Sequence, residues 1–193
     1  MIGPTSMQTM KTDNPTQKYE VPSYEATLEL LDPDGVDAVY VRKQRLRFLE
    51  DGVSTIEDYG WGNGIAFASH YAYPGRFVDR RLVGSALRST VALSRPYDAG
   101  EELVFSVERL VKNGFASRSE WWLEAELYHR VGRISLTVIL PAGRPVKSAK
   151  LVQPGLSVEK QILPRLQPDG RQLLKYDARR PAMTPRYVLL WDW

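Results

Sequence analysis

The stretch that decides the fold class is WWLEAELY, residues 121–128. Its odd-numbered positions, from Trp121 to Leu127, are all apolar, whereas its even-numbered positions hold Trp122, two glutamates and Tyr128. This alternation predicts a β-strand with one buried face and one wet face, because successive side chains of a strand point to opposite sides. The same period of two recurs at 24–30, 102–108, 134–140 and 187–193.

Turn-forming residues separate these segments. Clusters rich in glycine, proline, asparagine and aspartate, such as DPDG at 32–35 and KNG at 112–114, are mostly 11 to 18 residues apart. That spacing suits strands and hairpins and leaves little room for long helices. We therefore predict an all-β fold, an antiparallel β-sandwich of about nine or ten strands with little helix.

Length and composition predict one folded domain. The chain has 193 residues, of which 43% are hydrophobic and 25% charged, as in an ordinary globular protein. Residues 1–22 are polar and are expected to form a disordered tail, which leaves residues 23–193 as a single β-sandwich domain. The start of the chain has no apolar run like that of a signal peptide, so we expect a cytoplasmic protein. The apolar stretches are too short to span a bilayer, so we expect no membrane insertion.

The residue inventory argues against most catalytic chemistries. The chain has no cysteine and two histidines, His70 and His129, so we predict no metal site and no cofactor. A Gly-x-Ser-x-Gly nucleophile motif is absent from the sequence. Glu124 and Glu126 share one face of a single strand, whereas paired catalytic carboxylates normally flank a substrate from different strands. We therefore predict no catalytic residue and no enzyme; a hydrolase whose acid and base lie far apart in the sequence stays open.

Aromatic residues are the first candidates for binding. Trp121 and Trp122 are neighbours, so they point to opposite faces, and one of them is expected outside the core. We select Trp122 and Tyr128 as binding residues, together with Trp61 in the glycine-rich stretch 60–64. With Glu124 and Glu126 nearby, Trp122 and Tyr128 would also suit a carbohydrate-binding module, which is one alternative.

Basic residues are the second candidates. Arg42, Arg45 and Arg47 lie in one predicted strand, and residues 144–186 hold ten basic and three acidic residues. Such a balance fits a nucleic-acid partner, although the basic residues are not interleaved with aromatic ones and no recognition helix is predicted. Nucleic-acid binding through the basic C-terminal third is therefore a less favoured alternative; pairing with acidic residues of the same chain or a neighbour is preferred.

Three segments carry a resemblance to a known family. They are LSRPYDAGEELVF at 93–105, ISLTVILPAGRP at 134–145 and YVLLWDW at 187–193. Together they make the chain similar, over roughly residues 22–193, to an all-β module found C-terminal to helix-turn-helix domains in actinobacterial proteins. The helix-turn-helix itself is expected to be absent, because Tyr24 already opens the first predicted strand. The resemblance implies a sensing or interaction module in a bacterial regulatory or conflict-related system, and it transfers no catalytic residue.

These observations predict a non-enzymatic binding or protein-interaction module. A protein partner or self-association follows from the expectation of an exposed tryptophan and from the absence of a recognisable catalytic motif in the sequence. Carbohydrate and nucleic acid remain the two alternative ligands.

Overall fold

Strands make up all the regular structure of the described chain. The structure, a computed structural model, describes residues 17–61, 67–83, 86–115, 121–127, 129–154, 156–181 and 186–193, apart from the side chains at 61, 67, 68, 86 and 158. These residues form fourteen strands and no helix. Within this part of the chain, then, no helix could cross a bilayer.

The strands form three sheets. The largest has seven strands in the order β12-β13-β9-β1-β2-β7-β4: β12 (Arg165–Leu166), β13 (Gln172–Arg179), β9 (Arg133–Leu140), β1 (Tyr19–Leu30), β2 (Asp37–Phe48), β7 (Glu102–Lys112) and β4 (Phe67–Tyr73). The second has four strands: β11 (Val158–Gln161), β10 (Ser148–Gln153), β14 (Arg186–Asp192) and β8 (Trp121–Glu126). The third has three strands: β3 (Val53–Trp61), β6 (Ala86–Tyr97) and β5 (Arg76–Val83).

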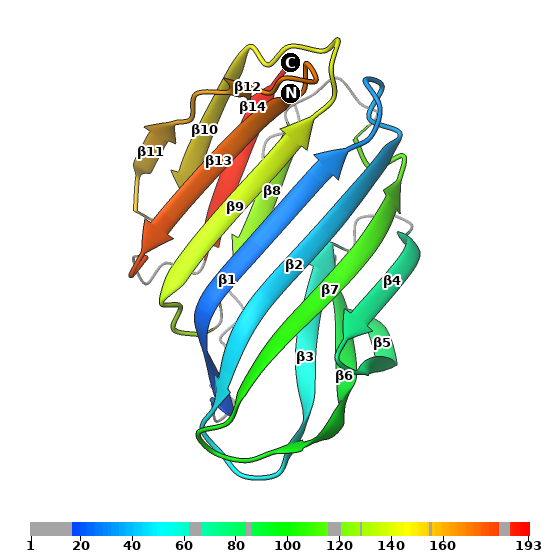
Figure 1. Cartoon of the computed structure of the whole chain (residues 1–193), viewed down its shortest axis with the longest axis vertical. Helices are drawn as coiled ribbons and strands as arrows, with labels where there is room; N and C mark the ends of the chain where they lie inside the picture. Colours follow the sequence, from blue (N-terminus) through cyan, green and yellow to red (C-terminus); the bar gives the residue numbers. More distant parts are fainter. Residues whose placement is uncertain are drawn as a thin grey trace.

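The two smaller sheets lie on the same side of the seven-stranded sheet. Figure 1 shows the four-stranded sheet behind β13 and β9, and the three-stranded sheet behind β2 and β7. Aromatic contacts join the layers: the rings of Tyr176 and Tyr187 stack 6.0 Å apart, and those of Phe48 and Tyr97 stack 4.9 Å apart. The opposite face of the large sheet is its outer face.

The predicted all-β, sandwich-like fold class is confirmed, with two differences in detail. The structure has fourteen strands rather than nine or ten, because the regions around 67–83 and 158–166 contribute several short ones. One pairing is parallel, between β1 and β9, with Tyr24 opposite Ile134 and Glu29 opposite Ile139. All other pairings between named strands are antiparallel.

Alternation along the strands sorts residues into core and surface. In β8, Trp121, Leu123 and Ala125 are buried, whereas Trp122 between them is 44% exposed. Burial of such apolar groups stabilises the fold by roughly 25 cal/mol for each Å² removed from water. The single core cluster draws on all three sheets.

The turn between β1 and β2 shows why its sequence is DPDG. The Asp32 carboxylate accepts hydrogen bonds from the backbone N–H groups of Asp34, Val36 and Asp37 at 2.8–3.0 Å. Gly35 has a φ of +71°, and a Cβ there would lie 2.1 Å from the carbonyl oxygen of Phe115. Glycine is therefore required at this position, and the prediction of a turn at DPDG agrees with these contacts.

The N-terminal boundary lies slightly before the predicted one. Strand β1 begins at Tyr19, so residues 19–22 of the predicted tail belong to the sheet. Residues 1–16 lie outside the described residues.

Candidate functional site

A buried cluster of charged side chains lies between the seven-stranded and three-stranded sheets. Its base is a row across three neighbouring strands of the large sheet, because Arg109 of β7 is opposite Tyr40 of β2 on one side and His70 of β4 on the other. The Arg109 guanidinium carbon lies 5.2 Å from the centre of the Tyr40 ring. The alternation of β7 directs Arg109 inward with the buried Val107 and Val111.

Asp58 of β3 closes this cluster from the opposite sheet. Its Oδ1 lies 2.7 Å from Nη2 of Arg42, and its Oδ2 lies 2.7 Å from Nη2 of Arg109. Its side chain is 0% exposed, which is rare for a carboxylate that is not paired. Two arginines therefore bind the two oxygens of one buried carboxylate, and this arrangement fixes β3 against β2 and β7.

His70 and the backbone of β3 complete the cluster. Nε of Arg109 donates a hydrogen bond to Nε2 of His70 at 3.1 Å, and Oδ2 of Asp58 lies 3.4 Å from the same nitrogen. Nη2 of Arg109 also donates to the carbonyl of Tyr59 at 3.2 Å. Gly60 lies over the Arg109 guanidinium, and a Cβ there would be 3.2 Å from it.

The charges of the cluster stabilise one another. Burial disfavours the ionised form of Asp58, but the positive charges of Arg42 and Arg109 outweigh it and hold the pKa of Asp58 far below its usual value. For His70 burial dominates and, helped by Arg109, lowers its pKa in spite of the nearby Asp58 carboxylate. The cluster at neutral pH thus contains one carboxylate, two guanidinium groups and a neutral imidazole.

This arrangement suits a structural clamp better than a reaction centre. A buried, paired carboxylate with a strongly lowered pKa is a poor proton acceptor, and catalytic carboxylates are usually tuned the other way, toward neutral pH. His70 does meet an acidic partner, Asp58, but the side chains of both are shielded from solvent. Within the described residues, no group of three or more His, Cys, Asp or Glu side chains is placed to hold a metal ion.

Sequence reasoning selected Arg42 and missed Asp58 and Arg109. The signal that could have found them is a charged residue at a position where the alternation of the strand predicts a buried side chain. Asp58 follows the buried Ile56 by two residues, and Arg109 follows the buried Val107 by two. Their sequence separation of 51 residues gives no hint that they meet.

The other predicted basic residues lie on the outer face of the large sheet, away from Arg42. Arg47 forms an ion pair with Glu20 of β1, and Arg45 lies 3.8 Å from Glu102 of β7. Both are cross-strand contacts at exposed positions, so they are worth little stability. Arg42 differs because the period of two turns it to the inner face.

Of the three predicted aromatic binding residues, the structure describes the side chain of Trp122 alone. Trp61 is the last residue of β3, and its side chain lies outside the described part. Tyr128 lies outside the described residues. Trp122 is exposed on the outer face of the four-stranded sheet.

The surface around Trp122 is apolar at its centre. Trp122 is opposite Leu190 of β14, and the next row on the same face brings Val188 of β14 opposite Val152 of β10. Leu190 and Val152 are half-buried and Val188 is buried. We call these four residues, with Glu124, the Trp122 face.

Ion pairs border the Trp122 face. Oε2 of Glu124 accepts a hydrogen bond at 2.7 Å from Nη2 of Arg186, and a second contact joins Glu124 to Nε of the same arginine. Nζ of Lys150 lies 3.2 Å from Oε1 of Glu159. An apolar centre with a charged rim is typical of protein–protein contact surfaces.

The chain resembles solved structures in fold only. No protein-family model and no curated protein matches it. An M1 zinc metallopeptidase from Deinococcus radiodurans has 16% sequence identity and a TM-score of 0.52, over 90% of this chain and 42% of the peptidase. A two-domain M1 zinc metallopeptidase bound to L-tryptophan has 14% identity and a TM-score of 0.52, over 91% of this chain and 43% of that one.

A third similar structure is a putative protease from Parabacteroides distasonis, with 12% identity and a TM-score of 0.57, over 92% of this chain and 41% of that protein. The chain therefore spans less than half the length of each of these proteins. Identities this low support a common fold and carry no residue roles across.

Proposed function

We propose that this chain is a non-catalytic interaction domain that binds a folded protein partner through the Trp122 face. The observation that carries the proposal is the 44% exposure of Trp122, next to Leu190, on a sheet whose other face is fully used by the core. Tryptophan is strongly enriched among the residues that dominate binding energy at protein interfaces.

The buried cluster supports a role without catalysis. Asp58 has both oxygens engaged by arginines, and its pKa is held far from the range that acid–base catalysis needs. The polar groups of the interior therefore serve to hold two sheets together.

The fold comparisons support a partner that is itself a folded domain. In the peptidases, the region similar to this chain makes up 41–43% of a longer protein, and one of them is described as having two domains. The module after helix-turn-helix domains, to which the sequence is similar, also stands beside another domain. The bacterial, regulatory or conflict-related setting and the cytoplasmic location belong to the same proposal.

Site-specific photocrosslinking tests the proposal. Benzoylphenylalanine at position 122 should give a defined adduct with one protein in cells of the native host, whereas the same group at Thr27, on the outer face of the large sheet, should not. Trp122→Glu should abolish co-purification of that protein, because a charge would be desolvated at the centre of the contact.

Other results would redirect or refute the proposal. An adduct between two copies of this chain would identify self-association instead. Glycan-array binding that is lost in Trp122→Ala would favour the carbohydrate alternative, in which Glu124 would have to leave Arg186 to meet a sugar. Identical adducts from positions 122 and 27 would exclude the Trp122 face.

A further inference from the structure

Strand β5 is an exposed edge of the three-stranded sheet. It lies apart from the Trp122 face, and its side chains are basic as well as apolar. It pairs with β6 on one side, and no described strand pairs with its other side. Seven of its eight residues are exposed, and the eighth, Phe77, is half-buried. The edge strands β11 and β12 are shorter, with four and two residues. A long edge strand presents a row of backbone donors and acceptors that another strand can use.

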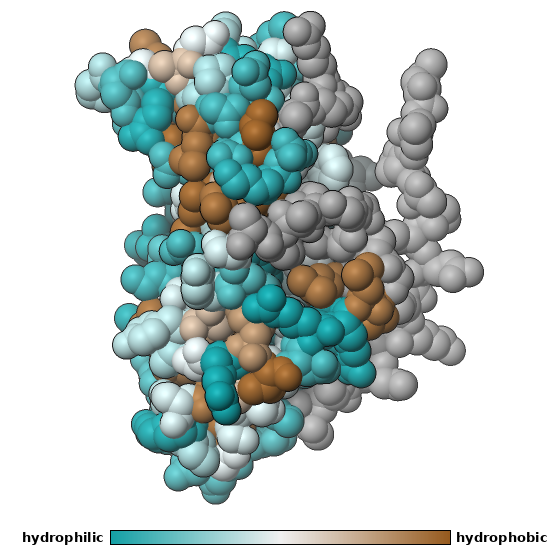
Figure 2. Space-filling view, turned by 90° about the vertical axis from the view of Figure 1, so that its right-hand side faces the viewer, coloured by the Kyte–Doolittle hydropathy of each residue, from teal (hydrophilic) through white to brown (hydrophobic). Residues whose placement is uncertain are grey.

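The side chains of β5 combine apolar and basic groups. Val78 is 53% exposed, Leu82 67% and Val83 37%. Its charged residues are the arginines at 76, 80 and 81 and a single acidic residue, Asp79. Figure 2 shows this side of the molecule, where hydrophobic and hydrophilic surface lie next to each other in the lower half. Arginines also protect an edge from aggregation, but this function alone does not explain three exposed aliphatic side chains on the same strand.

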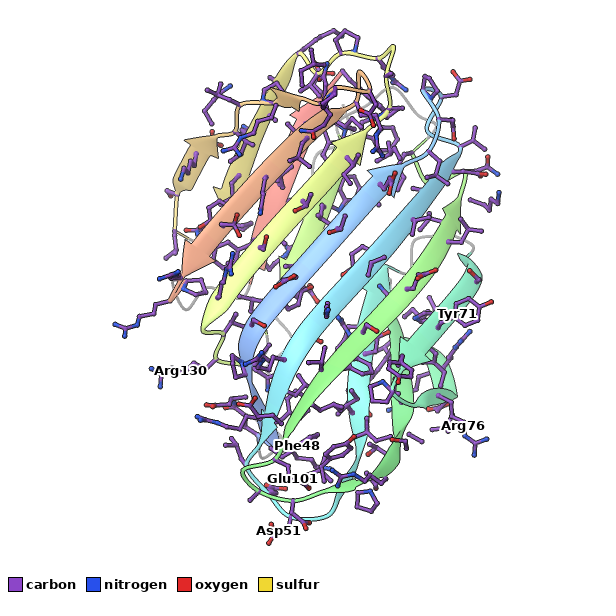
Figure 3. All side chains as sticks on the ribbon, in the orientation of Figure 1. Phe48, Asp51, Tyr71, Arg76, Glu101 and Arg130 are labelled. Carbon is purple, nitrogen blue, oxygen red and sulfur yellow. The ribbon has the colours of Figure 1, made fainter. Side chains whose placement is uncertain are left out.

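The edge is held in place from behind. The Phe77 ring lies 3.9 Å from the ring of His70, a member of the buried cluster. The guanidinium of Arg80 covers Phe77 at 4.6 Å and contacts the carbonyl of His70 at 3.4 Å. Arg76 and Tyr71 lie at the same margin of the molecule, as Figure 3 shows. A strand fixed in this way loses little conformational entropy when a partner adds to it.

We propose that β5 binds an extended acidic segment of a protein, which adds to the three-stranded sheet as a fourth strand. Backbone hydrogen bonds would supply affinity, and glutamate or aspartate side chains opposite the arginines would supply selectivity. Within the described residues, Arg76 and Arg81 have no carboxylate within ion-pair distance, so their charge is available to a partner. This site does not depend on the Trp122 face.

Two other occupants fit less well. A second copy of the chain would bring two edges of net positive charge together. A nucleic acid could stack a base on the exposed Tyr71, but it would leave the backbone donors and acceptors of the β5 edge without a strand to pair with, and Phe77 of β5 itself is covered by His70 and Arg80.

Peptide binding tests the proposal. The probe is a fluorescein-labelled, terminally blocked octapeptide of alternating valine and glutamate; the control replaces glutamate by lysine. Fluorescence anisotropy should show binding of the acidic peptide only, and this binding should be weaker at high salt.

The double variant Arg80→Glu/Arg81→Glu should weaken binding of the acidic peptide about tenfold or more. The charge-matched control Arg179→Glu/Arg180→Glu, on exposed residues at the end of β13, should change it less than about twofold.

A second readout locates the peptide. Hydrogen exchange of the β5 amides should slow when the acidic peptide binds, and Trp122→Ala should leave both readouts unchanged. Arg81→Glu alone keeps the Arg80 contacts and serves if the double variant unfolds. Equal binding of both peptides, unchanged affinity of the β5 variants, or protection confined to other strands would overturn the proposal. Protection of β5 by an oligothymidine at lower concentration than the peptide, or a dimer that Arg81→Glu dissociates, would assign the edge to nucleic acid or to a second copy.

Discussion

The two smaller sheets contact the same side of the large sheet through different chemistry. The four-stranded sheet contributes apolar residues such as Leu123, Leu189 and Trp191, all buried. The three-stranded sheet contributes Ile56 and Val91 as well, but places Asp58 among them against two arginines. An apolar contact tolerates small shifts, whereas a buried ion cluster is favourable only if every charge finds its partner. The ionic contact therefore specifies position, and the apolar contact mainly supplies stability.

Asp58→Ala should have the largest effect, because it leaves Arg42 and Arg109 buried without their carboxylate. Breaking a buried ion pair in this way costs about 3–5 kcal/mol. Urea unfolding followed by tryptophan fluorescence measures the loss. Glu108→Ala, on the outer face of β7, is the control and should change the free energy of unfolding by less than about 0.5 kcal/mol. A similar small change for Asp58→Ala would mean that the cluster does not clamp the sheets.

Leu189→Ala probes the apolar contact and should cost about 2–4 kcal/mol, through lost burial and a residual cavity. It should cost the same at every pH between neutral and mildly acidic, because leucine does not titrate. Leu190→Ala, one residue further and on the outer face, should cost less than half as much. Equal costs for the two leucines would show that β14 does not have the inner and outer faces described.

Gly60→Ala should cost about 1–3 kcal/mol, because the added methyl group presses on the Arg109 guanidinium. The double-mutant cycle with Arg109→Ala sharpens the test, since the cost of Gly60→Ala should largely vanish once the guanidinium is gone. If Gly60→Ala costs the same in both backgrounds, its effect lies in the β3 backbone and not in the cluster.

The smallest effect should be the pH dependence that comes from His70. Burial lowers its pKa in the folded state below the unfolded value of about 6.5, so the unfolded chain binds the proton more readily. Stability should therefore be complete above about pH 6.5 and fall as the pH decreases below it. His129, whose pKa burial also lowers, adds to this loss.

Urea midpoints at about pH 7.5 and about pH 5 measure this loss. His70→Gln should reduce the difference between the two midpoints, and His70→Gln/His129→Gln should reduce it further. A midpoint that rises on acidification in the unmodified protein would contradict the assigned direction.

Side-chain direction was predictable from the sequence, and partnership between distant residues was not. The period of two correctly separates Trp121 from Trp122, and the turn residues at 32–35 correctly end β1. The same period of two places Arg42 and Arg45 on opposite faces of their strand. The prediction that they form one set of basic binding residues rested on their charge alone and therefore missed this difference. The parallel contact of Tyr24 with Ile134 and the pairing of Asp58 with Arg109 depend on how distant strands meet, which local patterns do not encode. Exposure of β5 likewise depends on its place at the end of a sheet.

The central place of β1 in the seven-stranded sheet has a consequence for synthesis on the ribosome. β1 can form its hairpin with β2 early, but its other edge is completed by β9, which begins at Arg133. Until that residue leaves the exit tunnel, the nascent chain presents an open strand edge to the cell, a state that favours aggregation. Slowing translation before β9 has left the exit tunnel should therefore increase the demand of this protein for holding chaperones.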